Sequence, residues 1–130
     1  MCATSPENVS VQMPDAFQRG IHEFNSRRFF EAHEVWEERW LASPEPDKTF
    51  LQGIIQIAAA FHHHSRGNHR GACSLLLAGL GRVRSFPDNY YGIDLELLRS
   101  QAIAWAAVLK GSATAEHDLP IPQILLVLEQ

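Results

Sequence analysis

One twelve-residue stretch, FFEAHEVWEERW at residues 29–40, mixes aromatic rings with groups that could act as acids, bases or metal ligands. His33 and Glu37 stand four residues apart, which places them on the same side of a helix. An imidazole and a carboxylate in contact could move protons to and from a substrate, or could bind a divalent metal. On a helical wheel both fall among the aromatic rings, and Glu34 lies at the border of that face.

A carboxylate held among aromatic rings needs a partner. An isolated charge in an apolar medium costs several kcal/mol, so the pattern predicts that Glu37 is neutralised, paired or bound to a cation. The next helical segment offers a narrow polar stripe of Gln52, Gln56 and His63. Because the SPEP link between the two segments is short, they should lie antiparallel and adjacent. We therefore expect the stripe to face the His33–Glu37 pair.

Two interpretations of these polar residues remain open. They could form a hydrogen-bonded network that fixes how the helices pack, a role that some buried polar groups have. They could instead line a small-ligand or metal site, in which His33, Glu37 and His63 are the candidate ligands of a divalent metal ion. A metalloprotease helix would read H-E-x-x-H, with a histidine where this chain has Glu37, so we do not assign that mechanism.

The run His62–His64 supplies more imidazoles at the end of the same segment. Three consecutive helical residues cannot all point in one direction, and the helix dipole favours imidazoles near a helix C-terminus. We interpret the run as a helix end rather than as a metal site. His63 is the metal candidate within it, because it continues the polar stripe.

The segments that must position these groups all have helical periodicity. Helices are predicted at residues 14–26, 29–42, 47–66, 68–86 and 94–111. The expected N-cap residues are Asp47, Asn68 and Asp94, and Gly67 is expected to be left-handed. The fold class is therefore all-α, a bundle of about five helices with a short extended or helical C-terminal tail. We divide the chain into a flexible N-terminal arm at residues 1–13 and a single helical domain at residues 14–130.

The composition excludes several function classes. The formal net charge of −4 argues against a protein that binds nucleic acid through bulk electrostatics. No run approaches the ~18 to 20 apolar residues of a membrane span, and the N-terminus lacks the layout of a signal peptide. Nothing in their spacing pairs Cys2 with Cys73. We expect a cytoplasmic protein with no membrane association, whose candidate partners are a small molecule or a second copy of the chain.

Three segments of the sequence resemble a known family. They are FNSRRFFEAHEVWEERW, FLQGIIQIAAAFHH and RGNHRGA, followed by GID at the start of the last helix. The chain resembles domain-of-unknown-function family 309, small all-helical proteins of bacteria, archaea and plastids, over roughly residues 15–124. The resemblance implies a compact all-α fold and no established activity. It also implies that five polar positions belong to the family's signature segments: His33, Glu34, Glu37, Gln52 and Gln56.

Three hypotheses about function follow. The first is an uncharacterised cytosolic helical protein whose polar cluster, between the second and third helices, lines a small-ligand pocket. The second is a metal-dependent hydrolase-like enzyme built on His33, Glu34, Glu37 and a histidine of the third helix. The third is a non-catalytic interaction or self-associating module.

Overall fold

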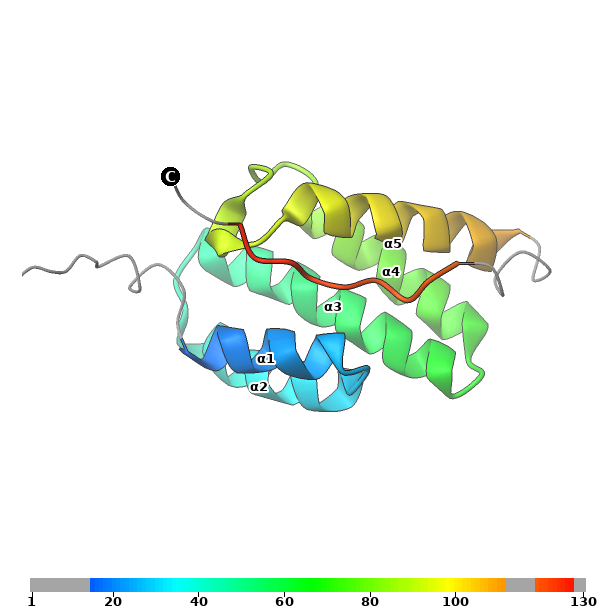
Figure 1. The fold of residues 1–130 in the computed structure, drawn as a ribbon, viewed down its shortest axis with the longest axis horizontal. Coiled ribbons are helices and arrows are strands. Elements are labelled where there is room, and N and C mark those ends of the chain that lie inside the picture. The colour runs from blue at the N-terminus through cyan, green and yellow to red at the C-terminus, as the bar shows by residue number, and fades with distance from the viewer. Residues whose placement is uncertain (1–14, 112–118, 128–130) are drawn as a thin grey trace, which may run out of the picture.

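The computed structural model describes residues 15–111 and 119–127, which form an all-α bundle (Figure 1). The α-helices in this part of the chain are α1 (Asp15–Asn25), α2 (Phe29–Ala42), α3 (Asp47–Ser65), α4 (His69–Val83) and α5 (Leu95–Lys110). A short 3-10 turn, η2 (Tyr90–Gly92), lies between α4 and α5. The predicted fold class is confirmed, and the helices end close to the predicted boundaries. The predicted N-terminal arm lies outside the described residues.

The longest helix, α3, lies at the centre of the bundle. Figure 1 shows α1 and α2 on one side of it and α4 and α5 on the other. A central helix must bury more than one face, and α3 buries residues around most of its circumference: Phe50, Leu51, Gly53, Ile54, Ile55, Ile57, Ala58, Ala60 and Phe61. Among the described helices, none combines the length and the apolar character that a membrane span requires.

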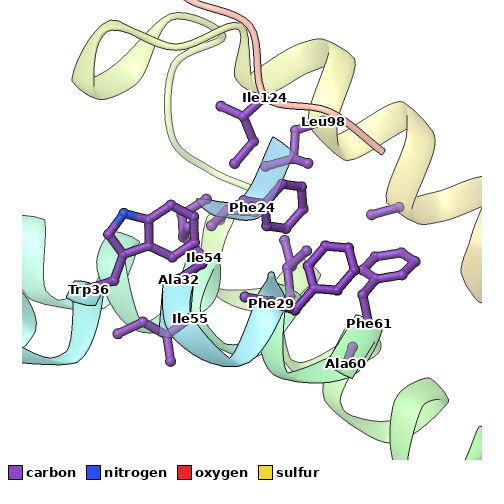
Figure 2. Close-up of a cluster of buried hydrophobic side chains, with 14 of the residues drawn as sticks. Phe24, Phe29, Ala32, Trp36, Ile54, Ile55, Ala60, Phe61, Leu98 and Ile124 are labelled. Carbon is purple, nitrogen blue, oxygen red and sulfur yellow. The ribbon is translucent and has the colours of Figure 1, made fainter. Parts of the chain in front are cut away.

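Aromatic rings from α1, α2 and α3 meet in the core (Figure 2). The indole of Trp36 on α2 stacks on Phe17 of α1 at 5.5 Å, and its N–H donates to the Phe17 backbone carbonyl at 3.1 Å. Gly20 makes this contact feasible, because a Cβ there would lie 1.9 Å from the indole nitrogen. The α1–α2 hairpin is therefore fixed by one tryptophan that packs against a glycine.

A second pair of glycines brings α3 and α4 together. A Cβ on Gly79 would lie 2.7 Å from the backbone oxygen of Gly53, closer than a real Cβ can approach. The two helix backbones are therefore in direct contact, which decides the side of α3 that α4 covers.

The helix caps were mostly predictable. Asn68 accepts a hydrogen bond from the backbone of Gly71, and Gly67 is left-handed with φ at 83°. Asp94 likewise caps α5. The prediction that Asp47 caps α3 is wrong. Pro46 occupies the cap position, so Asp47 falls inside the first turn, where its carboxylate accepts a hydrogen bond from the Tyr90 hydroxyl.

The C-terminal tail, residues 119–127, is extended and lies between α5 and α1 (Figure 1). The extended alternative is therefore confirmed and the helical alternative is wrong. Leu126 forms an isolated antiparallel bridge with Ile93, just before α5. The side chain of Ile124 enters the core beside Phe24 and Leu98 (Figure 2).

Candidate functional site

The core-facing side of α2 is not the side that its aromatic rings suggested. The buried residues of this helix are Phe29, Ala32 and Trp36. Glu37 is exposed, so the predicted burial of its carboxylate among rings is wrong. Ala32 extends the buried face to the side of Trp36 away from Glu37, whereas Phe30, on the side of Glu37, is 46% exposed. Glu37 follows Trp36 by about 100° around the helix, which turns it out to solvent.

Glu34 and Glu37 instead line a depression on the surface between α1 and α2. The depression has a volume of about 490 Å³ and also contains Arg19 and Glu38. These four side chains are exposed, so water hydrates their charges without any buried partner. Glu37 therefore does not pay the free-energy cost of a buried charge, and it needs no neutralising partner.

His33 lies beside α3, but at the C-terminal end of that helix. Its ring stacks on Phe30 with centroids 5.8 Å apart, and the other neighbour of Phe30 is His62 at 5.3 Å. Within the described residues, the buried Nδ1 of His33 has no hydrogen-bond partner. Burial of the His62 ring, helped by the nearby charges of Arg66 and His63, lowers the pKa of His62. Phe30 thus lies between two imidazoles, stacked on His33 and tilted against His62.

The polar stripe of α3 meets α4 and the α3–α4 turn rather than α2. Gln56 accepts a hydrogen bond from Arg82 of α4 at 3.1 Å, and the His63 ring lies 3.1 Å from the Asn68 amide. The prediction that these two residues face the His33–Glu37 pair is wrong. The physical reason is the close glycine contact between α3 and α4, which turns this side of α3 toward α4. Gln52 is half-buried, and its role stays a prediction.

The histidines at the end of α3 point to different neighbours, as predicted. His62 contacts Phe30, His63 contacts Asn68, and the ring of His64 lies 4.9 Å from that of Trp105. In residues 15–111 and 119–127, no three residues among His, Cys, Asp and Glu are grouped so that they could hold a metal ion. The metal-dependent alternative therefore has no ligand set in this part of the chain.

A groove between α4 and α5 is the better candidate site, although none of the sequence predictions pointed to it. Its volume is about 520 Å³, and three of its lining residues are Leu77, Leu80 and Ile103. Leu77 is 45% exposed and Ile103 is 58% exposed. Large aliphatic side chains that stay in water on both walls of one groove indicate a surface for an apolar partner.

The groove has small residues at its centre and charges at one end. Gly81 and Ser100 leave the middle of the groove open, and the charged lining residues are Arg84, Glu96 and Arg99. A Cβ on Gly81 would meet no atom within 4 Å. A helix could therefore approach both walls closely.

Arg99 fixes the closed end of the groove. Its guanidinium donates to the backbone carbonyls of Val83 and Phe86, both at 2.9 Å, and pairs with Asp88. Val83 is the last residue of α4 and Phe86 lies just beyond it, where backbone acceptors lack partners inside the helix. Arg99 thereby ties the end of α4 to the first turns of α5 and holds the two walls in place.

One signal in the sequence could have found the groove. Leu75, Leu76 and Leu77 are consecutive, and about 100° per residue spreads them over more than half of the helix circumference. A helix at the edge of a bundle cannot bury all three. Leu76 is fully buried, Leu75 is half-buried and Leu77 is exposed. Which of them faced solvent depended on the packing of α4.

The relatives that resemble this chain are described as uncharacterized proteins. An uncharacterized protein of Aquifex aeolicus (strain VF5) is 33% identical over 78 residues, which are 59% of this chain and 23% of that protein. The uncharacterized protein YpuF of Bacillus subtilis (strain 168) is 40% identical over 65 residues, which are 48% of this chain and 37% of YpuF. The chain thus spans well under half the length of either relative.

The match to the family itself covers the first helices. Residues 17–75 match the family described as Domain of unknown function (DUF309). This range holds all three segments on which the resemblance was based but not the GID that follows them, and it ends before Leu77, where the lining of the groove begins. Over residues 17–75, the chain is therefore similar to the DUF309 family.

Proposed function

We propose that this helical domain is a non-catalytic interaction module whose α4–α5 groove binds an amphipathic helix. The observation that carries the proposal is the exposure of Leu77 and Ile103 on facing walls of one groove. Covering apolar surface contributes about 25 cal/mol per Å². Docking of a helix across both side chains is therefore favourable.

The chemistry of the groove supports a binding role. An apolar groove with charges at its rim is the usual receptor for an amphipathic helix, because the groove buries the helix's apolar face and the rim pairs with its polar flank. The described residues that line the groove supply guanidinium groups, one carboxylate and a hydroxyl, and neither an imidazole nor a thiol. This set suits recognition better than proton transfer or nucleophilic attack.

The relatives support the view that the domain is a module of larger proteins, and Cys73 supports a cytoplasmic setting. The matched segments make up 23% and 37% of the two relatives, as expected of a module that works beside other parts of a chain. A cytoplasmic setting is part of the proposal. It is supported by the free Cys73 on α4, since reduced thiols are usual in that compartment.

A labelled helical peptide tests the proposal directly. The probe is a fluorescent, stapled peptide with the amphipathic sequence of α5, and its anisotropy is followed as the full chain is added. We expect a saturable rise. Leu77→Glu should weaken binding at least about tenfold, because a carboxylate would replace the apolar contact. The matched control is Leu125→Glu on the tail, a leucine 47% exposed outside this groove, which should leave the affinity unchanged.

Two results would overturn the proposal. One is the absence of binding by the wild-type chain up to about 1 mM peptide, where even weak recognition is measurable. The other is an equal loss of affinity in Leu77→Glu and Leu125→Glu, which would mean that the peptide adheres to exposed leucines in general.

A further inference from the structure

We infer that the occupant of the α4–α5 groove is a second copy of this chain, related to the first by a two-fold axis parallel to the two helices. The inference rests on the proposed function, because it names the partner of the same groove. It is carried by the arrangement of apolar and charged residues along the two walls.

The residues of the two walls stand opposite one another in matched pairs. α4 and α5 are antiparallel and are joined at the end that Arg99 closes (Figure 1). Arg84 and Glu96 lie at this closed end, one on each wall. Leu77 and Ile103 lie about two turns further along, again one on each wall. Since both helices rise about 1.5 Å per residue, Leu77 lies as far from Arg84 along α4 as Ile103 lies from Glu96 along α5.

A two-fold axis parallel to the helices exchanges the two walls and keeps the height. The α4 helix of one copy then lies over α5 of the other and runs antiparallel to it. Leu77 faces Ile103 of the second copy, and Arg84 faces Glu96 of the second copy. Each contact occurs twice, as the isologous interface of a symmetric dimer requires.

The charges of the groove are complementary under this operation. Within the described part of the chain, Arg84 makes no salt bridge and no side-chain hydrogen bond. Among the residues that the structure describes, the Glu96 carboxylate has only a long contact of 3.7 Å with Arg99, whose guanidinium is engaged more closely by Asp88. A free cation and a weakly paired carboxylate therefore meet twice in the dimer. Such pairs give register and partner choice more than affinity.

The small residues at the centre fit the same arrangement. Gly81 is exposed, and a side chain there would have open space in the single chain. In the dimer that space is taken by α5 of the second copy, which can approach closely because Ser100 opposite is also small. Gly81 therefore distinguishes the single chain, which tolerates a larger residue, from the dimer, which does not.

Sedimentation equilibrium of the full chain tests the inference, from about 1 µM to about 500 µM, the range in which weak to moderate complexes are half formed. We expect the mass to rise to that of two chains. Because a Cβ at Gly81 would meet no atom of the same copy within 4 Å, we expect Gly81→Leu to leave the single chain folded by circular dichroism and urea melt, and to weaken association at least about tenfold.

Charge exchange identifies the paired residues. Arg84→Glu and Glu96→Arg should each weaken association, because each places like charges opposite one another twice. An equimolar mixture of the two variants should associate again, since the mixed dimer restores opposite charges at both positions. The matched control is Arg66→Glu, an exposed arginine outside the groove, which should leave the association constant unchanged.

The possible failures separate the two proposals. A mass of one chain at about 500 µM overturns the second-copy inference, and peptide binding in the same groove would then leave the proposed function standing. A dimer that is unaffected by Gly81→Leu and by both charge variants uses another face and also overturns the inference. If the chain neither dimerises nor binds the α5 peptide, both proposals fall.

Discussion

Two grooves lie on nearly opposite sides of α5, and the described part of the chain fills one and leaves the other open. Gln101 and Trp105 face the tail, whereas Ser100 and Ile103 line the α4–α5 groove. At about 100° per residue these two pairs of residues point almost half a turn apart. One side of α5 is therefore covered by the tail of the same chain, whereas its other side lines the open groove.

The filled groove satisfies both the backbone and the side chains of its occupant. The Asn25 amide donates to the carbonyl of Ile124 at 2.9 Å and accepts from its N–H at 2.8 Å. The Trp105 indole donates to the Pro120 carbonyl, and the Asp94 N–H donates to the Leu125 carbonyl. Ile124 itself is only 1% exposed. An extended segment becomes part of a core when its polar groups find partners and one side chain in two points inward.

The open groove has apolar walls but no segment of the described chain to cover them. Its polar groups sit at the rim and one end, and its exposed leucine and isoleucine remain in water. The contrast teaches that burial of α5 on one side comes from the chain itself. On the other side, no described segment covers α5, and we propose that a second molecule does.

The largest expected effect is at the anchor of the filled groove. Ile124→Asp would place a carboxylate against Phe24 and Leu98 and should lower the free energy of unfolding by about 4 kcal/mol, measured by urea denaturation. Leu125→Asp, on the neighbouring outward-facing position, should change it by less than about 0.5 kcal/mol. Equal effects of the two substitutions would show that the tail is not part of the core.

Removal of the amide that holds the tail should have an intermediate effect. Asn25→Ala leaves the N–H and the carbonyl of Ile124 without their partners and should cost about 1 to 3 kcal/mol in urea denaturation. The exchange rate of the Ile124 amide hydrogen should rise as well. Ser26→Ala, at the exposed neighbour, is the control and should change neither quantity. Unchanged exchange at Ile124 would contradict the role given to Asn25.

The loop that joins the two walls of the open groove also holds the tail. We expect the free energy of unfolding of the protein to fall at alkaline pH because of Tyr90 in this loop. Burial and the hydrogen bond to Asp47 raise the pKa of Tyr90 to about 12. Between pH 10 and 12 the unfolded chain therefore loses this proton first, so stability should fall as the pH rises through that window. Tyr90→Phe should cost about 1 kcal/mol at neutral pH and remove this alkaline loss.

Urea melts at about pH 9 and about pH 11 measure the difference between the wild-type chain and Tyr90→Phe. Tyr91→Phe is the matched control, because it leaves the bond between Tyr90 and Asp47 in place and should keep the alkaline loss. An alkaline slope that is identical in the wild-type chain and in Tyr90→Phe would show that the Tyr90 proton does not contribute.

The smallest expected effect is at the open groove in dilute solution. Leu77→Ala should change the free energy of unfolding of the single chain by less than about 0.5 kcal/mol, because the side chain is already in water. Leu76→Ala, one residue earlier and fully buried, should cost about 2 to 5 kcal/mol. Both are measured near 1 µM, where association adds little to stability. A large loss in Leu77→Ala would mean that the groove is already covered.

Much of the fold followed from sequence, whereas little of the candidate site did. The periodicity of α2 and α3, the caps at Asn68 and Asp94 and the left-handed Gly67 were all predictable. The prediction that His33, Glu37 and Gln56 converge is wrong, since Glu37 is exposed and Gln56 bonds to α4. Aromatic rings are unreliable markers of the core side of α2, because Phe30 is 46% exposed while the small Ala32 is buried.

The sequence by itself determined where helices begin and end, because caps and periodicity act between residues no more than about four positions apart. The tertiary structure alone decided which side of each helix became buried. The contact of Asn25 with Ile124 spans 99 positions, and the Gly53–Gly79 contact turns one side of α3 away from α2. Such choices depend on how all the helices and the tail compete for a shared core. That competition left Glu37, Leu77 and Ile103 in water.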